Sequence, residues 1–407
     1  MTDVRSDLPD DGSAVELSMD NLVSHDEDLL DESPQLAQQA VASRSSAQTV
    51  MRRFQQHRAA MSGLVVLLLI MLLAFSSIGF GPIPGWWKLD YRVPMPLDGV
   101  GPPTITLWPP SLGEHPFGQD NIGRDYFALT MKGAQQSLTI AFLVGIVGTA
   151  IGLAIRGYRP VCEIQFDGFI YPAYDQIVSQ LAKIHARSRG QVKMPITIRV
   201  PFGGGIGAVE HHSESPEAYF AHTAGLKVVS CSNPVDAHFM VQQAIASDDP
   251  VLFFEPKRRY WEKAEVDTTM TPDLLWSARV VRPGADATLI AYGPMVKTCL
   301  DAATAAEQDG RSLEVVDLRS LSPLDFPTVM ESVRRTGRAI VVHEAASFVG
   351  MGAEIAARLS EELYYEMEAP VLRVTGFDTP YPPSRVEEDF LPDLDRVLHA
   401  VDRSLAF

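Results

Sequence analysis

The fold is decided by residues 156–220, which read RGYRPVCEIQFDGFIYPAYDQIVSQLAKIHARSRGQVKMPITIRVPFGGGIGAVEHHSESPEAYF. Pro160–Phe166 is a short apolar run, Tyr171–Ala186 has apolar residues at helical spacing, and Pro195–Val200 is rich in β-branched residues. This order predicts the strand, helix and strand of a buried parallel sheet. A glycine loop and two adjacent histidines follow the second strand, at the sheet end where open α/β folds bind ligands. The stretch therefore predicts an α/β protein with its site at this edge.

The same alternation continues to the C-terminus. We expect strands at Leu226–Ser230 and Pro250–Phe254 with a helix over Pro234–Ser247 between them. Residues 257–276 are charged and irregular, which is typical of an inter-domain linker. A second α/β domain follows. Its expected elements are strands near Ala287–Ala291, Leu313–Asp317, Ala339–His343 and Val371–Thr375 and a last helix over about Leu391–Leu405.

Composition excludes several classes of protein. The net charge of −17 argues against nucleic-acid binding, which needs a basic surface. The three cysteines, Cys162, Cys231 and Cys299, are far apart and show no CxxC spacing. We expect buried free thiols in a reducing compartment and no structural zinc site.

The N-terminal third has a different character. Residues 1–50 are acidic up to Glu32, contain only one basic residue before that point, and lack aromatic side chains, so a disordered tail is predicted. An uncharged run then extends from Ala59 to Trp87. It is long enough to cross a bilayer as a helix over about 59–80, and the alternative is a buried core helix. The basic residues just before it, Arg52, Arg53 and Arg58, place the N-terminus in the cytosol.

Residues 115–152 read HPFGQDNIGRDYFALTMKGAQQSLTIAFLVGIVGTAIG. Together with the preceding apolar run, they make residues 50 to about 150 resemble the N-terminal part of peptide-type ABC importer permeases. The resemblance implies a membrane segment over 51–144, with a loop at 81–132 and a second hydrophobic helix over about 133–155. The resemblance ends after two membrane spans, whereas permeases of that family have about six.

From about Gly145 onward the chain resembles a second family, the beta subunits of the thiamine-diphosphate-dependent component of 2-oxoacid dehydrogenase complexes. The motifs are EIQFDGFIYPAYDQIVSQ, PFGGGIGAVEHHSESPEAYF, AGLKVVSCSNPVDA, VVDLRSLSPLDF, VVHEAASFVGMGAEIAARL and APVLRVTGFDTPYPP. The branched-chain members look nearest, because EIQF, HHS and FEPKRRY occur together. The resemblance implies a pyrimidine-binding α/β domain over 145–256, truncated at its N-terminus, a linker over 257–276, and a transketolase C-terminal-like α/β domain over 277–407.

A thiamine-diphosphate enzyme must hold a carboxylate against the pyrimidine ring of the cofactor and exclude water. In the family a glutamate two residues before the glycine equivalent to Gly145 does this, so Leu143 replaces it here. The first strand and helix of the family domain, which precede that glutamate, are also replaced by permease-like sequence. These departures predict that the chain is impaired as an enzyme.

Other family positions are retained. By resemblance, Phe169 packs on the pyrimidine ring, with an ordinary core aromatic as the alternative, and Gln165 precedes it. His212 faces the reacting carbon and assists acyl transfer to a lipoyl arm. Adjacent side chains of an extended chain point to opposite faces, so we expect His211 to be structural. The resemblance further implies that carbonyl groups at Ile196 and Thr197 bind a monovalent cation such as K⁺.

The glycine loop PFGGGIG is a weak phosphate-loop signal, because the third glycine of a GxGxxG pattern is replaced by Glu210, whose charge would repel a pyrophosphate. His343 and Glu344 end a predicted strand and serve either the site or the interface between the two domains. The GDG motif that binds Mg²⁺ and the diphosphate is absent from the sequence. By resemblance it lies in a separate alpha subunit, with which the chain would form a heterotetramer.

The sequence thus predicts the beta subunit of a branched-chain 2-oxoacid dehydrogenase, or of pyruvate dehydrogenase, fused to a permease fragment. Its reaction would be oxidative decarboxylation with acyl transfer to a lipoyl acyltransferase core. The alternative is a truncated ABC permease with an inert soluble tail. We expect the N-terminal segment to lie in the cytoplasmic membrane and the enzyme domains in the cytoplasm. A natural fusion and an accidental join of two genes both fit the sequence.

Overall fold

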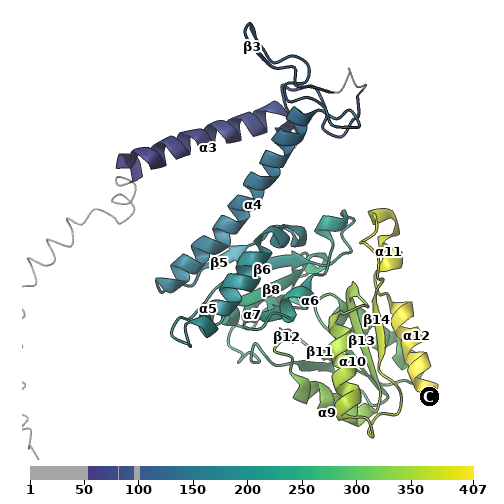
Figure 1. Cartoon of the computed structure of the whole chain (residues 1–407). Coiled ribbons are helices and arrows are strands. Elements are labelled where there is room, and N and C mark those ends of the chain that lie inside the picture. The colour runs from purple at the N-terminus through teal and green to yellow at the C-terminus, as the bar shows by residue number, and fades with distance from the viewer. Residues whose placement is uncertain (1–53, 81, 96–100) are drawn as a thin grey trace, which may run out of the picture. The chain divides into compact units, whose positions relative to one another are not determined.

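The computed structural model describes residues 54–80, 82–95 and 101–407, without the side chains of 140 and 142–144 (Figure 1). The predicted acidic tail over 1–50 lies outside the described residues. The chain divides into two compact units, Met1–Gln135 and Gln136–Phe407.

The first unit is built on two helices that share a small apolar cluster. α3 (Arg58–Ser77) begins at His57, whose ring accepts a hydrogen bond from the Ala60 amide, and it is the one helix in the described ranges long and apolar enough to cross a membrane. Ala74 of α3 packs against Phe127 and Met131 of α4 (Tyr126–Ile155). The short strands between them are β1 (Gly79–Phe80), β2 (Ile83–Pro84), β3 (Thr106–Leu107) and β4 (Pro110–Ser111).

The start of α4 is set by Asp125, which caps it. The Asp125 carboxylate accepts hydrogen bonds from the Ala128 amide at 2.8 Å and from the Trp87 indole at 2.9 Å, and it pairs with His115 at 2.9 Å. Because this cap satisfies otherwise free amides, the helix begins earlier than the expected residue 133. The HPFGQDNIGRD segment therefore folds as a helix cap.

The second unit contains two five-stranded sheets, the first with strand order β12-β7-β8-β6-β5. All its strands are parallel except β12, which pairs antiparallel with β7. The elements in and around this sheet are β5 (Val161–Glu163), the 3-10 turn η2 (Asp167–Ala173), the π-helix η3 (Gln176–Leu181), α5 (Ala182–Arg187), β6 (Thr197–Phe202), the 3-10 turn η4 (Glu210–His212), α6 (Glu217–Ala221), β7 (Lys227–Ser230), α7 (Pro234–Ala246), β8 (Val251–Pro256), the 3-10 turn η5 (Lys257–Arg259) and β12 (Ser320–Ser322).

The second sheet has the order β14-β13-β10-β11-β9, in which β9 alone is antiparallel. Its elements are β9 (Arg279–Arg282), β10 (Ala287–Ala291), α8 (Met295–Gln308), β11 (Leu313–Asp317), α9 (Phe326–Thr336), β13 (Ala339–Ala346), α10 (Met351–Glu362), β14 (Leu372–Gly376), the 3-10 turn η6 (Ser384–Val386), α11 (Glu387–Phe390) and α12 (Leu394–Leu405).

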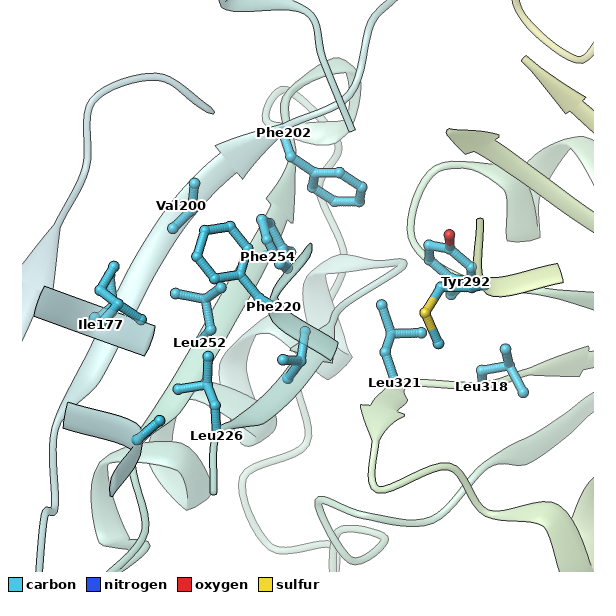
Figure 2. Packing of buried hydrophobic residues seen from close by; sticks show 14 of the residues in the cluster. Ile177, Val200, Phe202, Phe220, Leu226, Leu252, Phe254, Tyr292, Leu318 and Leu321 are labelled. Atoms are coloured by element: carbon cyan, nitrogen blue, oxygen red, sulfur yellow. The ribbon is translucent and has the colours of Figure 1, made fainter. Parts of the chain in front are cut away.

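The two sheets share one apolar core. Figure 2 shows Phe202, Phe220 and Phe254 of the first sheet region packed together, with Leu321 of β12 and with Tyr292, which follows β10 of the second sheet, in the same cluster. All five side chains are at most 2% exposed. Because this core includes residues of both sheets, it fixes the position of one sheet relative to the other. The loops at the strand ends, which form the site, are positioned in this way.

The structure differs from the sequence-based expectation at three places. The single helix expected over Tyr171–Ala186 is broken into η2, η3 and α5, with Pro172, which has no backbone N–H, inside the first turn. The antiparallel strands β9 and β12 were not expected. Finally, α4 begins at Tyr126, before the expected residue 133. Its second half, for which the sequence allows either a membrane span or a helix of the α/β domain, is packed into the core of the α/β unit, where Val147, Ala150 and Ala154 are at most 5% exposed.

Candidate cofactor-binding site

Three aromatic rings meet beyond the carboxyl ends of β5 and β6. The His212 ring stacks on Phe166, with centroids 4.0 Å apart and planes 26° apart. The Phe169 ring meets His212 edge-on at 5.6 Å and is 36% exposed. We call Phe166, Phe169 and His212 the aromatic corner. It presents a partly open aromatic surface of the kind on which a planar ring can pack.

A buried ion pair holds this corner together from behind. The Lys257 ammonium donates hydrogen bonds to the Asp167 carboxylate and to the His212 carbonyl. Both charged side chains are at most 5% exposed. Burial raises the pKa of Asp167 and lowers that of Lys257, in each case against the attraction of the partner. The pair thus connects three segments: the turn after β5, the turn that contains His212, and the end of β8.

Further contacts join the same two segments. The Glu214 amide donates to Asp167 at 2.8 Å, and the Tyr171 hydroxyl donates to the Glu214 carboxylate at 2.7 Å. Gly168 has no room for a side chain, since a Cβ atom there would lie 2.4 Å from the His211 carbonyl oxygen. Close approach of the two backbones therefore requires glycine at this position.

From the sequence, an extended chain is expected at the two histidines, but the structure has a turn there. Residues 210–212 form the turn η4, which brings the rings of His211 and His212 within 4.1 Å. His211 is exposed, whereas His212 is half-buried against Phe166. Side chains alternate between two faces only along an extended chain, so this alternation does not assign a role to His211.

Of the other sequence-predicted residues, Gln165 is exposed two residues after the end of β5 and directly before Phe166. Leu143 lies within α4, which continues through it without a break. Ile196 and Thr197 are each 1% exposed and lie at the amino end of β6, the end opposite the glycine loop. The Ile196 carbonyl accepts the Val251 amide at 2.9 Å. These two residues are therefore not brought together with the aromatic corner.

The pair His343 and Glu344 lies where the two sheets meet. His343 is buried, and its Nε2 accepts the Gly352 amide at 3.1 Å. Burial lowers the pKa of His343 to about 4, so the ring is neutral. Glu344 accepts the Gly204 amide at 3.0 Å. Glu344 thus makes contacts between the two domains, whereas the contacts of His343 lie within the second domain.

Sequence reasoning missed Asp167, Lys257 and the buried pair of Glu217 and Tyr292, whose hydroxyl donates to Glu217 at 2.5 Å. Charged residues in apolar surroundings were the available signal. Asp167 directly follows the predicted strand Pro160–Phe166, and Lys257 comes shortly after the predicted strand Pro250–Phe254. Neither position indicates a partner 90 residues away in sequence.

Comparison with known proteins agrees with this architecture. Residues 144–262 match the pyrimidine binding domain of transketolase, and residues 277–397 match the transketolase C-terminal domain. Residues 45–84 match the N-terminal transmembrane domain of oligopeptide transport permease C. A solved structure, an inactive beta4 tetramer of split gene transketolase, superimposes with a TM-score of 0.55 at 24% identity, covering 65% of this chain and 81% of that one, and supports the fold alone.

Several relatives are closer in sequence. A pyruvate dehydrogenase E1 component subunit beta of Leifsonia xyli is 60% identical over 263 residues, which are 65% of this chain and 78% of that relative. A 3-methyl-2-oxobutanoate dehydrogenase subunit beta of Mycobacterium tuberculosis is 56% identical over 261 residues, 64% of this chain and 75% of the relative. A 2-oxoisovalerate dehydrogenase subunit beta of Pseudomonas aeruginosa is 42% identical over 278 residues, with 64% and 78% coverage.

The fold and the site together define a transketolase-like α/β protein with an aromatic and histidine-bearing corner on its pyrimidine-binding domain. Within that class, the chain belongs to the family of beta subunits of the E1 component of pyruvate and branched-chain 2-oxoacid dehydrogenases. This family depends on thiamine diphosphate. The chain also carries a permease-type segment ahead of the family region.

The residues present fit the cofactor only in part. The aromatic corner offers a surface for a pyrimidine ring. The carboxylate beside it, Asp167, is engaged by Lys257 and by the Glu214 amide, so it is not a free proton acceptor. The position where the family resemblance places the acceptor is occupied by Leu143. The described residues therefore supply a binding surface but not the group that would activate the cofactor.

Proposed function

We propose that the chain is a branched-chain E1 beta subunit that retains the surface of its site and has lost most of its activity. The observation that carries the proposal is the aromatic corner, in which His212 is stacked on Phe166 and anchored through its carbonyl by the buried Lys257. The matching substrate is 3-methyl-2-oxobutanoate, with pyruvate as the other candidate, since relatives of both names are similar to this chain.

The roles of the individual residues follow from their positions. Phe169 is open enough to pack on the cofactor pyrimidine, and exposed Gln165 lies beside it. When bound, thiamine diphosphate supplies the carbon nucleophile for decarboxylation of a 2-oxoacid. His212 is half-buried with its ring held by Phe166, so it is oriented to hold or donate a proton during acyl transfer to a lipoyl group.

The same proposal includes partners and ions. An alpha subunit would complete a heterotetramer and hold the diphosphate and Mg²⁺, and a lipoyl acyltransferase core would accept the acyl group. A K⁺ ion at Ile196 and Thr197 would use the second lone pair of the Ile196 carbonyl, since one already accepts the Val251 amide.

We further infer that α3 anchors the chain in the cytoplasmic membrane. A cytoplasmic α/β unit, which assembly with an alpha subunit requires, needs a second crossing. In α4, residues 145–155 are packed into the core, and the remaining twelve residues from 133 would span only about 18 Å of a hydrocarbon layer about 30 Å thick. Cytoplasmic placement of the enzyme domains therefore requires residues 145–155 to belong to the second crossing and not to the core.

The experiment mixes the chain with a competent alpha subunit, thiamine diphosphate and Mg²⁺, and measures decarboxylation of 3-methyl-2-oxobutanoate. We expect a rate lower by roughly 10²–10⁴-fold than that of a graft in which a relative's N-terminal segment is joined at Gly145, because a positioned proton acceptor contributes about that much. Leu143→Glu alone should recover little, since the preceding strand and helix are also replaced.

His212→Ala in the graft should abolish acylation of the lipoyl acceptor, and His211→Ala is the matched control that should leave it largely intact. If the unmodified chain turns over at the rate of the graft, the proposed impairment is wrong. If the graft is inactive too, the assignment as a functional beta-subunit surface fails.

A further inference from the structure

The glycine loop that the sequence marked as a weak phosphate-loop signal is already occupied by an anion from the chain itself. The Gly205 and Gly207 amides donate to the two carboxylate oxygens of Glu387 at 2.9 and 2.8 Å. Gly205 and Gly207 have φ values of +78° and +69°, which let the loop direct its amides toward one anion. Glu387 begins α11, which follows the second sheet (Figure 1).

Two more side chains of the second sheet region complete this arrangement. The Tyr381 hydroxyl donates to Glu387 at 2.5 Å, and Glu344 accepts the Gly204 amide. Arg258 lies 3.6 Å from the second oxygen of Glu344. We call Glu344, Tyr381 and Glu387 the carboxylate clamp. Glu344 and Glu387 are at most 5% exposed and Tyr381 is 9% exposed, so water does not compete strongly for these hydrogen bonds.

The charge state of Glu387 suits this role. Burial acts to raise the pKa of Glu387, but the hydrogen bonds from Tyr381 and from the amides of Gly207, Gly205 and Ile206 outweigh it, and the pKa is lowered. An ionised carboxylate accepts stronger hydrogen bonds from amides than a neutral group does. The clamp therefore holds the loop through charge-assisted bonds.

The loop leads directly to His212. The Gly203 amide donates to the Glu214 carbonyl at 3.0 Å, which closes the segment from 203 to 214 into a single loop. Lys257 fixes one side of this loop at His212, and the clamp fixes its middle. The conformation that brings His212 against Phe166 thus depends on side chains from both domains.

We propose that the carboxylate clamp is a positioning device for His212, with Glu387 as its central residue. The clamp fills the anion-binding loop with a carboxylate from the second domain, so the loop orders the histidine instead of binding a phosphate. This inference rests on the proposed function of His212, but its test below does not require turnover.

The test uses the full chain in detergent micelles and the variants Glu387→Ala and Glu388→Ala. Glu388 is the next residue on the same helix and is exposed, so it is a control with the same change of charge. Hydrogen–deuterium exchange of residues 203–214 is followed by mass spectrometry, together with the rate at which diethyl pyrocarbonate modifies His212. For Glu387→Ala we expect at least tenfold faster exchange in the loop and several-fold faster modification of His212, with β6, β8 and β13 unchanged.

Sodium acetate at about 100 mM should restore slow exchange in Glu387→Ala, because a free carboxylate can occupy the vacated amides, and chloride at the same concentration should not. A general loss of packing would not be reversed in this way. Tyr381→Phe removes one hydroxyl only and should show a smaller change in the same direction, which keeps the test available if Glu387→Ala does not fold.

The clamp would be overturned if hydrogen–deuterium exchange of the loop is unchanged in both Glu387→Ala and Tyr381→Phe. It would also be overturned if Glu387→Ala folds and its loop still exchanges fast in the presence of acetate. Because neither readout involves the cofactor, failure of the clamp is distinct from failure of the proposed function, which is decided by the activity of the graft.

Discussion

At the scale of single residues, the site depends on charges that the fold has buried. Asp167 and Lys257 are at most 5% exposed and contact each other and the histidine loop. Removing one member of such a pair leaves the other charge without compensation, which costs far more than losing an exposed ion pair. The site and the stability of the α/β unit are therefore coupled through this pair.

Lys257→Met should lower the free energy of unfolding by about 3–5 kcal/mol, because Asp167 is left buried and unpaired. Lys297→Met is the matched control. Lys297 pairs with Asp301 four residues along α8, both half-exposed, and its loss should cost less than about 1 kcal/mol. Chemical denaturation of both variants in detergent measures the difference. Equal costs would show that the pair is not buried in solution.

Glu217 makes stability depend on pH. Burial raises the pKa of Glu217 from 4.5 to about 7, although the hydrogen bond from Tyr292 acts to lower it. Between these pH values the folded state holds a proton that the unfolded state has lost, so the free energy of unfolding falls as pH rises, by on the order of 3 kcal/mol. The stability is fully present below about pH 4.5 and lost above about pH 7.

Glu217→Gln should remove this part of the pH dependence. Asp317, whose pKa burial also raises to about 7, contributes with the same sign. His343, whose pKa burial lowers from 6.5 to about 4, contributes with the opposite sign between these pH values. The fall of stability with pH should therefore be smaller in Glu217→Gln than in the parent chain. The measurement is the midpoint of thermal unfolding at several pH values from 5 to 8, for the parent chain and the variant. Identical slopes in the two proteins would contradict the assignment.

At the scale of elements, α4 belongs to two structures. Its first turns are capped by Asp125 and pack on α3, and Gln135 donates to the Ala74 and Gly79 carbonyls at 2.9 and 2.8 Å. Its last turns lie in the α/β core. Small residues at 145, 148, 150 and 152 permit close packing in either a membrane or a core, so the sequence alone left both settings open.

Two substitutions distinguish the settings. Val147 is fully buried, whereas Leu153 is 42% exposed on the same helix. Val147→Asp should destabilise the α/β unit by at least about 3 kcal/mol, because it buries an unpaired charge, while Leu153→Asp should cost less than about 1 kcal/mol. Thermal unfolding monitored by near-UV circular dichroism compares them. A helix that crossed the bilayer would tolerate neither charge.

At the scale of the whole molecule, the chain joins a segment of permease type to an enzyme subunit of the transketolase class. Assembly of a beta subunit with an alpha subunit requires both subunits to lie on one side of the membrane. The number of crossings therefore decides whether the subunit can meet its partner.

We expect the chain to stay with membranes during alkaline carbonate washing and deletion of residues 58–77 to release it, because α3 is long and apolar enough to span. Release of the intact chain would refute the anchor. Chymotrypsin added outside spheroplasts reports the side of the α/β unit through Trp261, which is 91% exposed. With α3 as the single crossing and the N-terminus inside, cleavage after Trp261 is expected. Protection of Trp261 from cleavage would indicate a second crossing and an α/β unit in the cytoplasm.

Much of the α/β unit could be predicted from sequence, because the period of apolar residues records which segments are buried on both faces. The strands at Leu313–Asp317 and Ala287–Ala291 have the predicted bounds. The comparisons confirm the transketolase-like fold and the beta-subunit family, for which the long ordered motifs, from EIQFDGFIYPAYDQIVSQ to APVLRVTGFDTPYPP, were sufficient. The assignments of Phe169, Gln165, His212, Leu143, Ile196 and Thr197 to roles in the site stay predictions.

The contacts between segments far apart in sequence became visible only in the folded chain. No local pattern marks Lys257 as the partner of Asp167, or Glu387 as the anion held by the glycine loop, because each depends on how two strand ends meet. The turn that brings His211 and His212 together, and the antiparallel edge strands β9 and β12, likewise arise from packing. The family, the succession of buried strands and the long apolar helix could be read from the sequence, since these follow from the chemistry of adjacent residues. The arrangement of the site required the fold, since burial and charge pairing are properties of the assembled core.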